Sequence, residues 1–415
     1  MLQFKKTAAL TLISLLAACG GGTQTLGSTP GPIGGGGGVG STGSTSTHTF
    51  VAPTESKTYV GVGGSQVFDY LTDDRDCCNQ QGQQFAGHTS TVRSSEISIG
   101  YDPREATFTL KITDPLSGAE ASTRFQDPAS RTDFGGAKEP QWGTPNLPNP
   151  NLRYLQAGDG NPLSPYDHSG TGFIDPGTNA IAPMGGDKST YQAASLFYLK
   201  PGTETQYVTY AGYIRNAYTF NIDRDTGILL VTNKLERGAF AFGEMTAKEN
   251  VPSTGTGTYT GSMLATLVFN PTMDGQDIAS AVVLPTYFQW MHGTSTVNVD
   301  FLNNSFQLAL AGTVTKPFFD HYTGPRATVL AAGATFAAAG TGSINMINFG
   351  GFKGQFQSAR FTNTDGTVRN VTIGGSSIDG TFYGPAANEV GGGFHLAGGN
   401  PDERIDVLGA FVGKK

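Results

Sequence analysis

The sequence has few charged residues, and this shortage limits what the protein can be. Asp, Glu, Lys and Arg make up 14% of the 415 residues, and the formal net charge is −7. A nucleic-acid-binding protein normally carries a basic footprint, so this class is excluded. The aromatic share of 10% is too high, and the charge too low, for a chain that is disordered throughout. The sequence therefore predicts a folded protein without a nucleic-acid partner.

Cysteine is also scarce, with three in the whole chain. Cys77 and Cys78 are neighbours, and no second Cys/His pair stands at the spacing of a zinc site, so no metal site is expected. In an oxidising compartment the two thiols form a local disulfide or pair with another chain. We predict the local disulfide, in a structural role.

Catalytic motifs are missing as well. No two of the six histidines stand three to five residues apart, which excludes an HExxH zinc motif, and there is no G-x-S-x-G elbow or Walker loop. Tyr166, Asp167, His168 and Ser169 are adjacent and cannot adopt the geometry of a catalytic relay. The sequence thus predicts no catalytic residue, no enzyme activity and no cofactor. An alternative is haem capture with His168, or His321 and Tyr322, as axial ligands.

Glycine, in contrast, is abundant. The 59 glycines exclude a helical bundle, because each costs roughly 1 kcal/mol in a helix relative to Ala. Together with 22 prolines they indicate many turns. We therefore predict an all-β protein.

The first 18 residues have the order of an export signal, with Lys5 and Lys6 before an apolar stretch. The following LAAC, which ends at Cys19, resembles the lipobox of bacterial lipoproteins. The resemblance implies cleavage before Cys19 and lipidation of its sulfur, including palmitate. Gly20 follows where lipoproteins of the inner membrane often have Asp, which implies the outer membrane.

Residues 19–47 form the predicted tether. From Gly20 to Thr47 there is no charged and no aromatic residue, and twelve of the 28 residues are glycine. Such a segment behaves as a flexible coil with a root-mean-square reach of roughly 30 Å. An anchor with this tether indicates a display or capture protein, exposed on the cell surface.

Residues 48–250 are predicted to be a small β-rich domain with long Pro-rich loops. Eleven prolines lie between Pro103 and Pro183, and such irregular connections are often binding loops. Trp142, Tyr154 and Tyr166 are candidate anchors for a protein partner. Alternatively, the same rings pack the connection onto the domain. Strands are expected near 105–113, 207–213, 217–222, 227–231 and 238–242.

Residues 251–415 contain eight or nine strand patterns separated by Gly, Asn or Asp turns. The expected strands are 259–269, 294–301, 305–310, 341–349, 352–361, 368–373, 378–383, 393–396 and 405–412. Alternating faces with Gly at the bends favour a closed antiparallel barrel, and one of about eight strands is narrow enough for side chains to fill.

One stretch of this half resembles a known family. GTFYGPAANEVGGGF at 380–394 is similar to the closing hairpin of the transferrin-binding protein B type barrel, usually GxFYGPxAxExGGxF. GTYTG at 257–261 and GFKGQF at 351–356 resemble its opening strand and penultimate hairpin, and GAFAFG at 238–243 its junction with a handle domain. The resemblance implies one lobe, a handle followed by an eight-stranded barrel. From the residues themselves, Glu389 is expected to accept backbone amides within its own turn.

The resemblance implies that the protein binds an iron-carrying, transferrin-like protein or another nutrient ligand for an outer-membrane transporter. An adhesin or immune-evasion lipoprotein on the same scaffold is an alternative. A membrane-spanning barrel is disfavoured, because the strand patterns are short or broken. The uncharged stretch from Ala327 is rich in Gly, Ser and Thr and does not predict a transmembrane helix.

Overall fold

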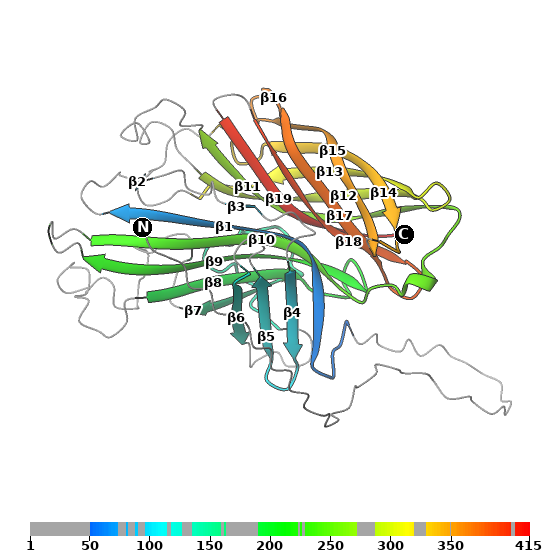
Figure 1. The fold of residues 1–415 in the computed structure, drawn as a ribbon, viewed down its shortest axis with the longest axis horizontal. Coiled ribbons are helices and arrows are strands. Elements are labelled where there is room, and N and C mark those ends of the chain that lie inside the picture. Colours follow the sequence, from blue (N-terminus) through cyan, green and yellow to red (C-terminus); the bar gives the residue numbers. More distant parts are fainter. Residues whose placement is uncertain are drawn as a thin grey trace, which may run out of the picture. The chain divides into compact units, whose positions relative to one another are not determined.

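A computed structural model describes residues 50–73, 80–81, 88–89, 96–113, 118–126, 135–158, 162, 190–222, 225, 229–271, 287–318, 329–348, 350–399 and 403–415. The predicted signal peptide and tether lie outside these residues. Residues 47–415 form one unit by their internal contacts. The described parts consist of two β-sheets and one 3-10 helix, η1 (Lys248–Asn250), which confirms the all-β prediction (Figure 1). No helix among them is long and apolar enough to cross a membrane.

The first sheet has ten strands. They are β1 (Lys57–Asp73), β2 (Gln80–Gln81), β3 (His88–Thr89), β4 (Glu96–Asp102), β5 (Thr107–Thr113), β6 (Glu120–Gln126), β7 (Leu152–Gly158), β8 (Thr190–Leu199), β9 (Val208–Ile222) and β10 (Leu229–Gly243). Eight of them follow the order β6-β5-β4-β1-β10-β9-β8-β7, and β2 and β3 pair with β1. The central pair, β1 and β10, joins segments far apart in the sequence, with Gly61 opposite Phe242.

The second sheet is a closed barrel. Its strands are β11 (Thr256–Pro271), β12 (Tyr287–Asp300), β13 (Ser305–Val314), β14 (Thr335–Asn345), β15 (Gly351–Thr362), β16 (Val368–Asn370), β17 (Ile373–Tyr383), β18 (Glu389–Gly398) and β19 (Glu403–Lys414). The order β14-β13-β12-β11-β19-β18-β17-β15 is closed by pairing of β14 with β15, and β16 adds to β15. All of these pairs are antiparallel. The predicted eight-stranded antiparallel barrel is therefore confirmed.

The buried apolar side chains form three cores. One core fills the barrel and includes Phe306, Phe352 and Phe382. A second lies on one face of the first sheet and includes Phe108 and Tyr198. The third contains residues of both sheets. Burial of apolar surface at this third core, at about 25 cal/mol per Å², is the main force that joins the sheets.

Both faces of strand β11 are apolar because each face is covered by a different core. Met263 and Leu267 point into the barrel core, whereas Leu264 and Val268 belong to the core shared with the first sheet. Because side chains alternate along a strand, a strand covered on both sides has an almost continuous apolar sequence. This is the pattern of MLATLVF at 263–269.

The structure differs from the predicted strands mainly in the first sheet. The patterns at 207–213 and 217–222 form the single long strand β9, and those at 227–231 and 238–242 fall in β10. Strands β1, β4, β6, β7 and β8 were not predicted, so the sheet is larger than expected. In the barrel, β14 begins at Thr335 rather than at residue 341, since Ala and Gly at 337–340 disguise the strand.

Candidate functional site

Most of the predicted site residues cannot be placed. Cys19, Cys77, Cys78 and Tyr166 lie outside the described residues, as do the proposed haem ligands His168, His321 and Tyr322. Trp142 and Tyr154 are described. These two side chains therefore decide what the structure says about the Pro-rich connection.

Tyr154 is part of the core and is not an exposed anchor. It lies on β7, is 2% exposed, and stacks on Phe197 with ring centroids 5.6 Å apart. Its hydroxyl donates a hydrogen bond to the Pro145 carbonyl at 3.0 Å, and burial raises its pKa. A side chain in this position packs the connection onto the sheet, so the prediction of a partner contact at Tyr154 is corrected.

Trp142 lies at the surface of the same connection and is half-buried. Its carbonyl accepts a hydrogen bond from Ser195 Oγ at 2.6 Å, and the next carbonyl, that of Gly143, accepts one from Trp290 Nε1 at 2.8 Å. The backbone is thus fixed to β8 of the first sheet and to β12 of the barrel.

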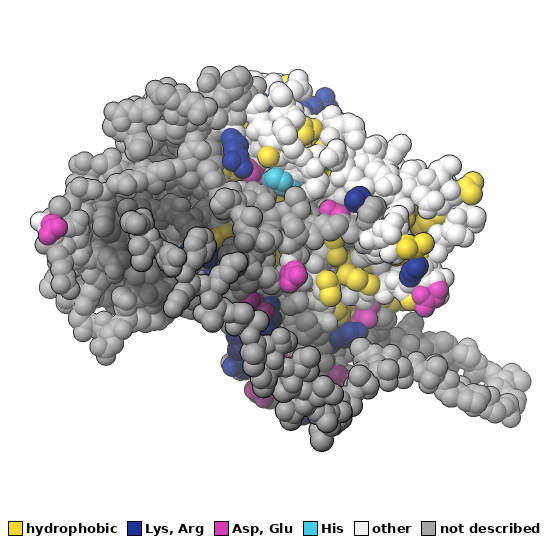
Figure 2. Space-filling model, in the orientation of Figure 1, with side chains coloured by type: hydrophobic (Ala, Val, Ile, Leu, Met, Phe, Trp, Pro, Cys, Tyr) yellow, Lys and Arg dark blue, Asp and Glu magenta, His cyan; other side chains and the backbone are white. Residues whose placement is uncertain are grey.

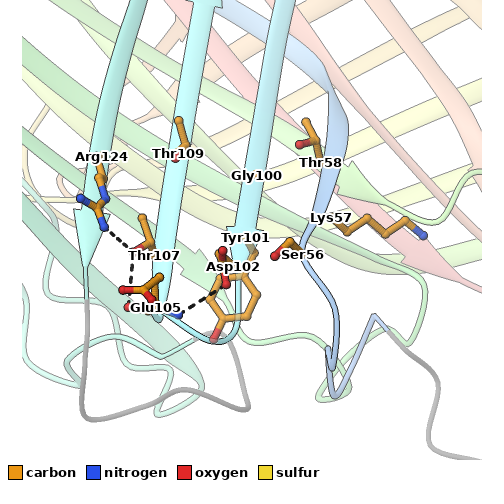
Figure 3. Close-up of a pocket in the computed structure, with 10 residues that line it drawn as sticks. All are labelled: Ser56, Lys57, Thr58, Gly100, Tyr101, Asp102, Glu105, Thr107, Thr109 and Arg124. Carbon is orange, nitrogen blue, oxygen red and sulfur yellow. Dashed lines mark hydrogen bonds between the residues drawn. The ribbon is translucent and has the colours of Figure 1, made fainter.

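A polar hollow of about 370 Å³ lies on the first sheet, between the start of β1 and the strands β4, β5 and β6 (Figure 3). Side-chain hydroxyls from Ser56, Thr58, Thr107 and Thr109 line it. Lys57 extends away from the hollow in Figure 3 and forms an ion pair with Glu244 at 2.5 Å.

Asp102 and Arg124, two charged residues of the hollow, form hydrogen bonds within the fold. Asp102 Oδ1 accepts the amides of Arg104 at 2.9 Å and Glu105 at 3.4 Å, which lowers the pKa of Asp102. Arg124 Nη2 donates to Thr107 Oγ1 at 3.3 Å. The hollow therefore offers hydrogen bonds to a polar ligand group. Over the described stretches, no three His, Cys, Asp or Glu side chains cluster to hold a metal ion.

The most densely connected polar group lies where the two sheets meet. Arg237 on β10 is fully buried, and its Nη2 donates to Asp406 Oδ1 on β19 at 3.0 Å. Its Nε donates to Gln66 Oε1 on β1 at 2.8 Å, and its Nη1 donates to Thr266 Oγ1 on β11. His395 Nε2 and Arg404 Nη2 complete the cluster, at 3.1 and 3.0 Å from the Asp406 carboxylate. We call these six side chains the junction cluster.

Mutual neutralisation makes this burial tolerable. Burial lowers the pKa of Arg237 to about 10, partly offset by Asp406, so the guanidinium stays charged at neutral pH. For Asp406 burial opposes ionisation, but the His395 hydrogen bond and the charge of Arg237 hold its pKa below the usual range. Breaking such a pair by removing one partner leaves an uncompensated buried charge. The cluster therefore ties the first sheet to the barrel.

Glu389, in the family-like hairpin, makes a second link between the sheets. Its carboxylate accepts three backbone amides at the start of β9, those of Gln206, Tyr207 and Val208, at 2.6, 2.7 and 3.1 Å. It thus accepts amides as expected, but from the first sheet and not from its own turn. Burial raises the pKa of Glu389, and the three amides oppose this shift.

Sequence reasoning missed the junction cluster. Its signal was present: Arg237 and Asp406 directly precede apolar runs, GAFAF after Arg237 and VLGAFV after Asp406. A charge that continues directly into a buried apolar run indicates a buried partner. The identity of that partner depends on a pairing between distant segments, which one sequence does not reveal.

The fold and these links define a class of protein: an all-β unit in which an open sheet is fixed to a closed barrel by a shared core and buried polar contacts. Residues 251–415 match the family described as the C-lobe and N-lobe beta barrels of Tf-binding protein B. The barrel of this chain is thus transferrin-binding protein B-like, as the hairpin motif predicted. No curated protein sequence matches the chain.

Solved structures of transferrin-binding protein B are distantly similar. The protein from Haemophilus parasuis Hp5 is 13% identical over 88% of this chain and 77% of its own, with a TM-score of 0.26. Intact Ap-TbpB is 12% identical over 86% and 77%, also with a TM-score of 0.26. The isotype 1 protein from serogroup B Neisseria meningitidis is 11% identical over 87% and 77%, with a TM-score of 0.22.

Proposed function

We propose that the protein is a non-enzymatic lipoprotein of the outer membrane that binds an iron-carrying, transferrin-like protein or another nutrient ligand at the cell surface. The observation that carries this proposal is the match of residues 251–415 to the barrels of Tf-binding protein B. The leader and Cys19 add the anchor, and the tether adds the reach to present the folded unit to a large ligand. A barrel is a scaffold, so its family alone does not choose the ligand.

The Pro-rich connection supplies the proposed contact surface. Trp142 is partly exposed on backbone that hydrogen bonds fix to both sheets, and this arrangement lowers the entropy cost of binding. Tyr166 belongs to the same connection and is proposed as a second contact. Aromatic side chains of this kind supply much of the binding energy at protein interfaces.

The first experiment is a pull-down with transferrin, haemoproteins and haem as separate probes. We expect a protein ligand to be retained by the wild type, and at least tenfold less by Trp142→Ala. Val368→Ala, at an exposed site of the barrel, is the matched control and should bind like the wild type. Absence of any retained ligand contradicts the capture function. A complement regulator and a matrix protein are offered as further probes, and retention of one of these instead identifies an adhesin.

The second experiment tests the anchor and the location. Palmitate labelling should depend on Cys19 and vanish in Cys19→Ala. Protease treatment of intact cells should remove the protein. Full protection would place it on the periplasmic side and contradict surface display.

A further inference from the structure

Three segments meet at one end of the barrel, which we call the barrel tip. They are the β12–β13 turn (301–304), the β14–β15 turn (345–348) and the segment around η1 (248–253). They enclose a groove of about 560 Å³ whose apolar lining includes Val251, Pro252, Phe301, Ile344 and Met346. Figure 1 places the C-terminus at this end, and Figure 2, in the same orientation, shows hydrophobic, basic and acidic side chains there.

Two large aliphatic side chains project from the tip. Leu302 is 66% exposed and Ile347 is 78% exposed. Each is held out by a capped turn: Asp300 accepts the Asn303 amide at 3.0 Å, and Asn345 Oδ1 accepts the amides of Ile347 at 3.1 Å and Asn348 at 2.8 Å. A backbone hydrogen bond of 2.8 Å from Ile344 to Asn304 joins the two turns. The pair is therefore displayed on backbone that is ordered before any contact is made.

The tip is more basic than the rest of the protein. Lys248, Lys414 and Lys415 are exposed there, against one exposed carboxylate, Glu249. The Asp300 carboxylate accepts a hydrogen bond from the Asn303 side chain at 2.7 Å, which lowers its pKa, so Asp300 is a second negative charge beside the three lysines. In a chain with a formal charge of −7, this local excess of lysine is complementary to an anionic surface.

The tip also lies on the side where the described chain begins. Lys57, at the start of β1, contacts Glu244 at 2.5 Å, and Glu244 stands four residues before η1 in the sequence. The 49 residues before Phe50 include Cys19 and the predicted tether. With a reach of roughly 30 Å, such a tether holds the folded unit near the membrane at a high effective concentration.

We propose that the barrel tip rests on the surface of a lipid bilayer, with Leu302 and Ile347 inserted at the level of the head groups and the lysines against anionic lipid. Aliphatic side chains beside lysines are the composition of membrane-surface contacts. The closeness of the bilayer rests on the lipid anchor of the proposed function. The tip would orient the tethered unit and leave the opposite end of the barrel and the Pro-rich connection free.

The test uses tryptophan as a depth probe in the full lipidated chain. Leu302→Trp and Ile347→Trp are reconstituted in vesicles of phosphatidylethanolamine and phosphatidylglycerol whose acyl chains carry bromine, a quencher of indole fluorescence. Val368→Trp is the matched control, since Val368 is 54% exposed beyond the other end of β15. All three sites are exposed, so the substitutions should leave the fold intact, as circular dichroism verifies.

Quenching of the added indole at 302 and 347, and not at 368, is the expected result. Replacing phosphatidylglycerol with phosphatidylcholine should weaken it. Absence of quenching at 302 and 347, or equal quenching at all three sites, overturns the proposal. The mass of the Cys19 peptide reports acylation separately, so failure of the anchor is distinguished from failure of the tip. If Leu302→Asp with Ile347→Asp abolishes ligand capture and no quenching occurs, the tip is a protein interface and the proposal is wrong.

Discussion

The two sheets solve the same packing problem in different ways. The barrel closes on itself through the β14–β15 pair, and its inward side chains fill one core. The first sheet follows an open path that ends at β6 and β7. It covers one face with its own core and the other with residues shared with the barrel. The barrel is thus complete by hydrogen bonding, whereas the first sheet depends on a neighbour to bury its second face.

The difference teaches where each half is vulnerable. A closed barrel of eight strands has little spare volume. Substitutions should therefore destabilise it most at core side chains and at glycines that pack directly against neighbouring atoms. The first sheet meets the barrel through charged groups that are buried only because they neutralise one another. Three pairs of substitutions test this contrast.

The largest effect is expected from Asp406→Ala in the junction cluster. It leaves the Arg237 guanidinium buried without its counter-charge, which should lower the free energy of unfolding by about 3–5 kcal/mol. Urea denaturation measures it. Arg404→Ala removes another partner of the same carboxylate, but from a side chain that is 38% exposed, and should cost less than about 1 kcal/mol. Equal losses for both variants would show that the buried pair does not tie the sheets together.

A smaller effect is expected within the barrel, from Gly380→Ala on β17. A Cβ at Gly380 would collide with the Phe352 ring in the barrel core, so the change should destabilise the fold by about 1–3 kcal/mol. Gly375→Ala lies on the same strand, where a Cβ meets nothing within 4 Å, and should change stability by no more than about 0.5 kcal/mol. Thermal unfolding compares the two variants. Similar melting temperatures would mean that the barrel accommodates a Cβ at Gly380 without loss of stability, which would contradict the prediction.

The smallest expected effect is a change in acid sensitivity. The pKa of Asp406 is lowered in the folded protein, so its contribution is present above the unfolded value of about 3.9 and is lost as the pH falls below it. Asp406→Asn should flatten this loss in urea titrations at successive pH values. Asp365→Asn is the control, because Asp365 is exposed and its lowered pKa comes from Thr367 in the same turn. If the stability of Asp406→Asn falls with pH as steeply as that of the wild type, Asp406 is not the source of the acid sensitivity.

Local pattern was enough for most of the barrel. Strands such as β13, with alternating buried Phe306, Leu308 and Leu310, carry period-two signals, and β15 and β16 are joined by the turn NTDG at 363–366. The family-like hairpin at 380–394 added the order of the last strands. In the first sheet, KTYVGVGGSQVFDYLTD of β1 has no clear alternation, and its glycines hide a strand of 17 residues. Its partner β10 is far along the chain, so neither extent nor pairing was visible.

For the candidate site, too, the sequence indicated part of the answer and the tertiary structure supplied the rest. The sequence selected Trp142 and Tyr154 equally, because both are aromatic side chains in a Pro-rich connection. Only the stacking of Tyr154 on Phe197 separates a core residue from a surface one. The role of Glu389 was predicted in kind, an acceptor of amides, yet those amides belong to Gln206, Tyr207 and Val208.

By itself the sequence determined the all-β class and the closed antiparallel barrel, since both follow from turn residues and from alternation along single strands, and the resemblance of the hairpin supplied the number of eight strands. The predicted leader, Cys19 and tether also rest on local composition. The tertiary structure alone decided how the first sheet closes around β1 and β10, which charges share a buried site, and which aromatic and aliphatic side chains remain exposed. These features depend on register and desolvation between segments that are separated in the sequence, and local sequence carries no record of either.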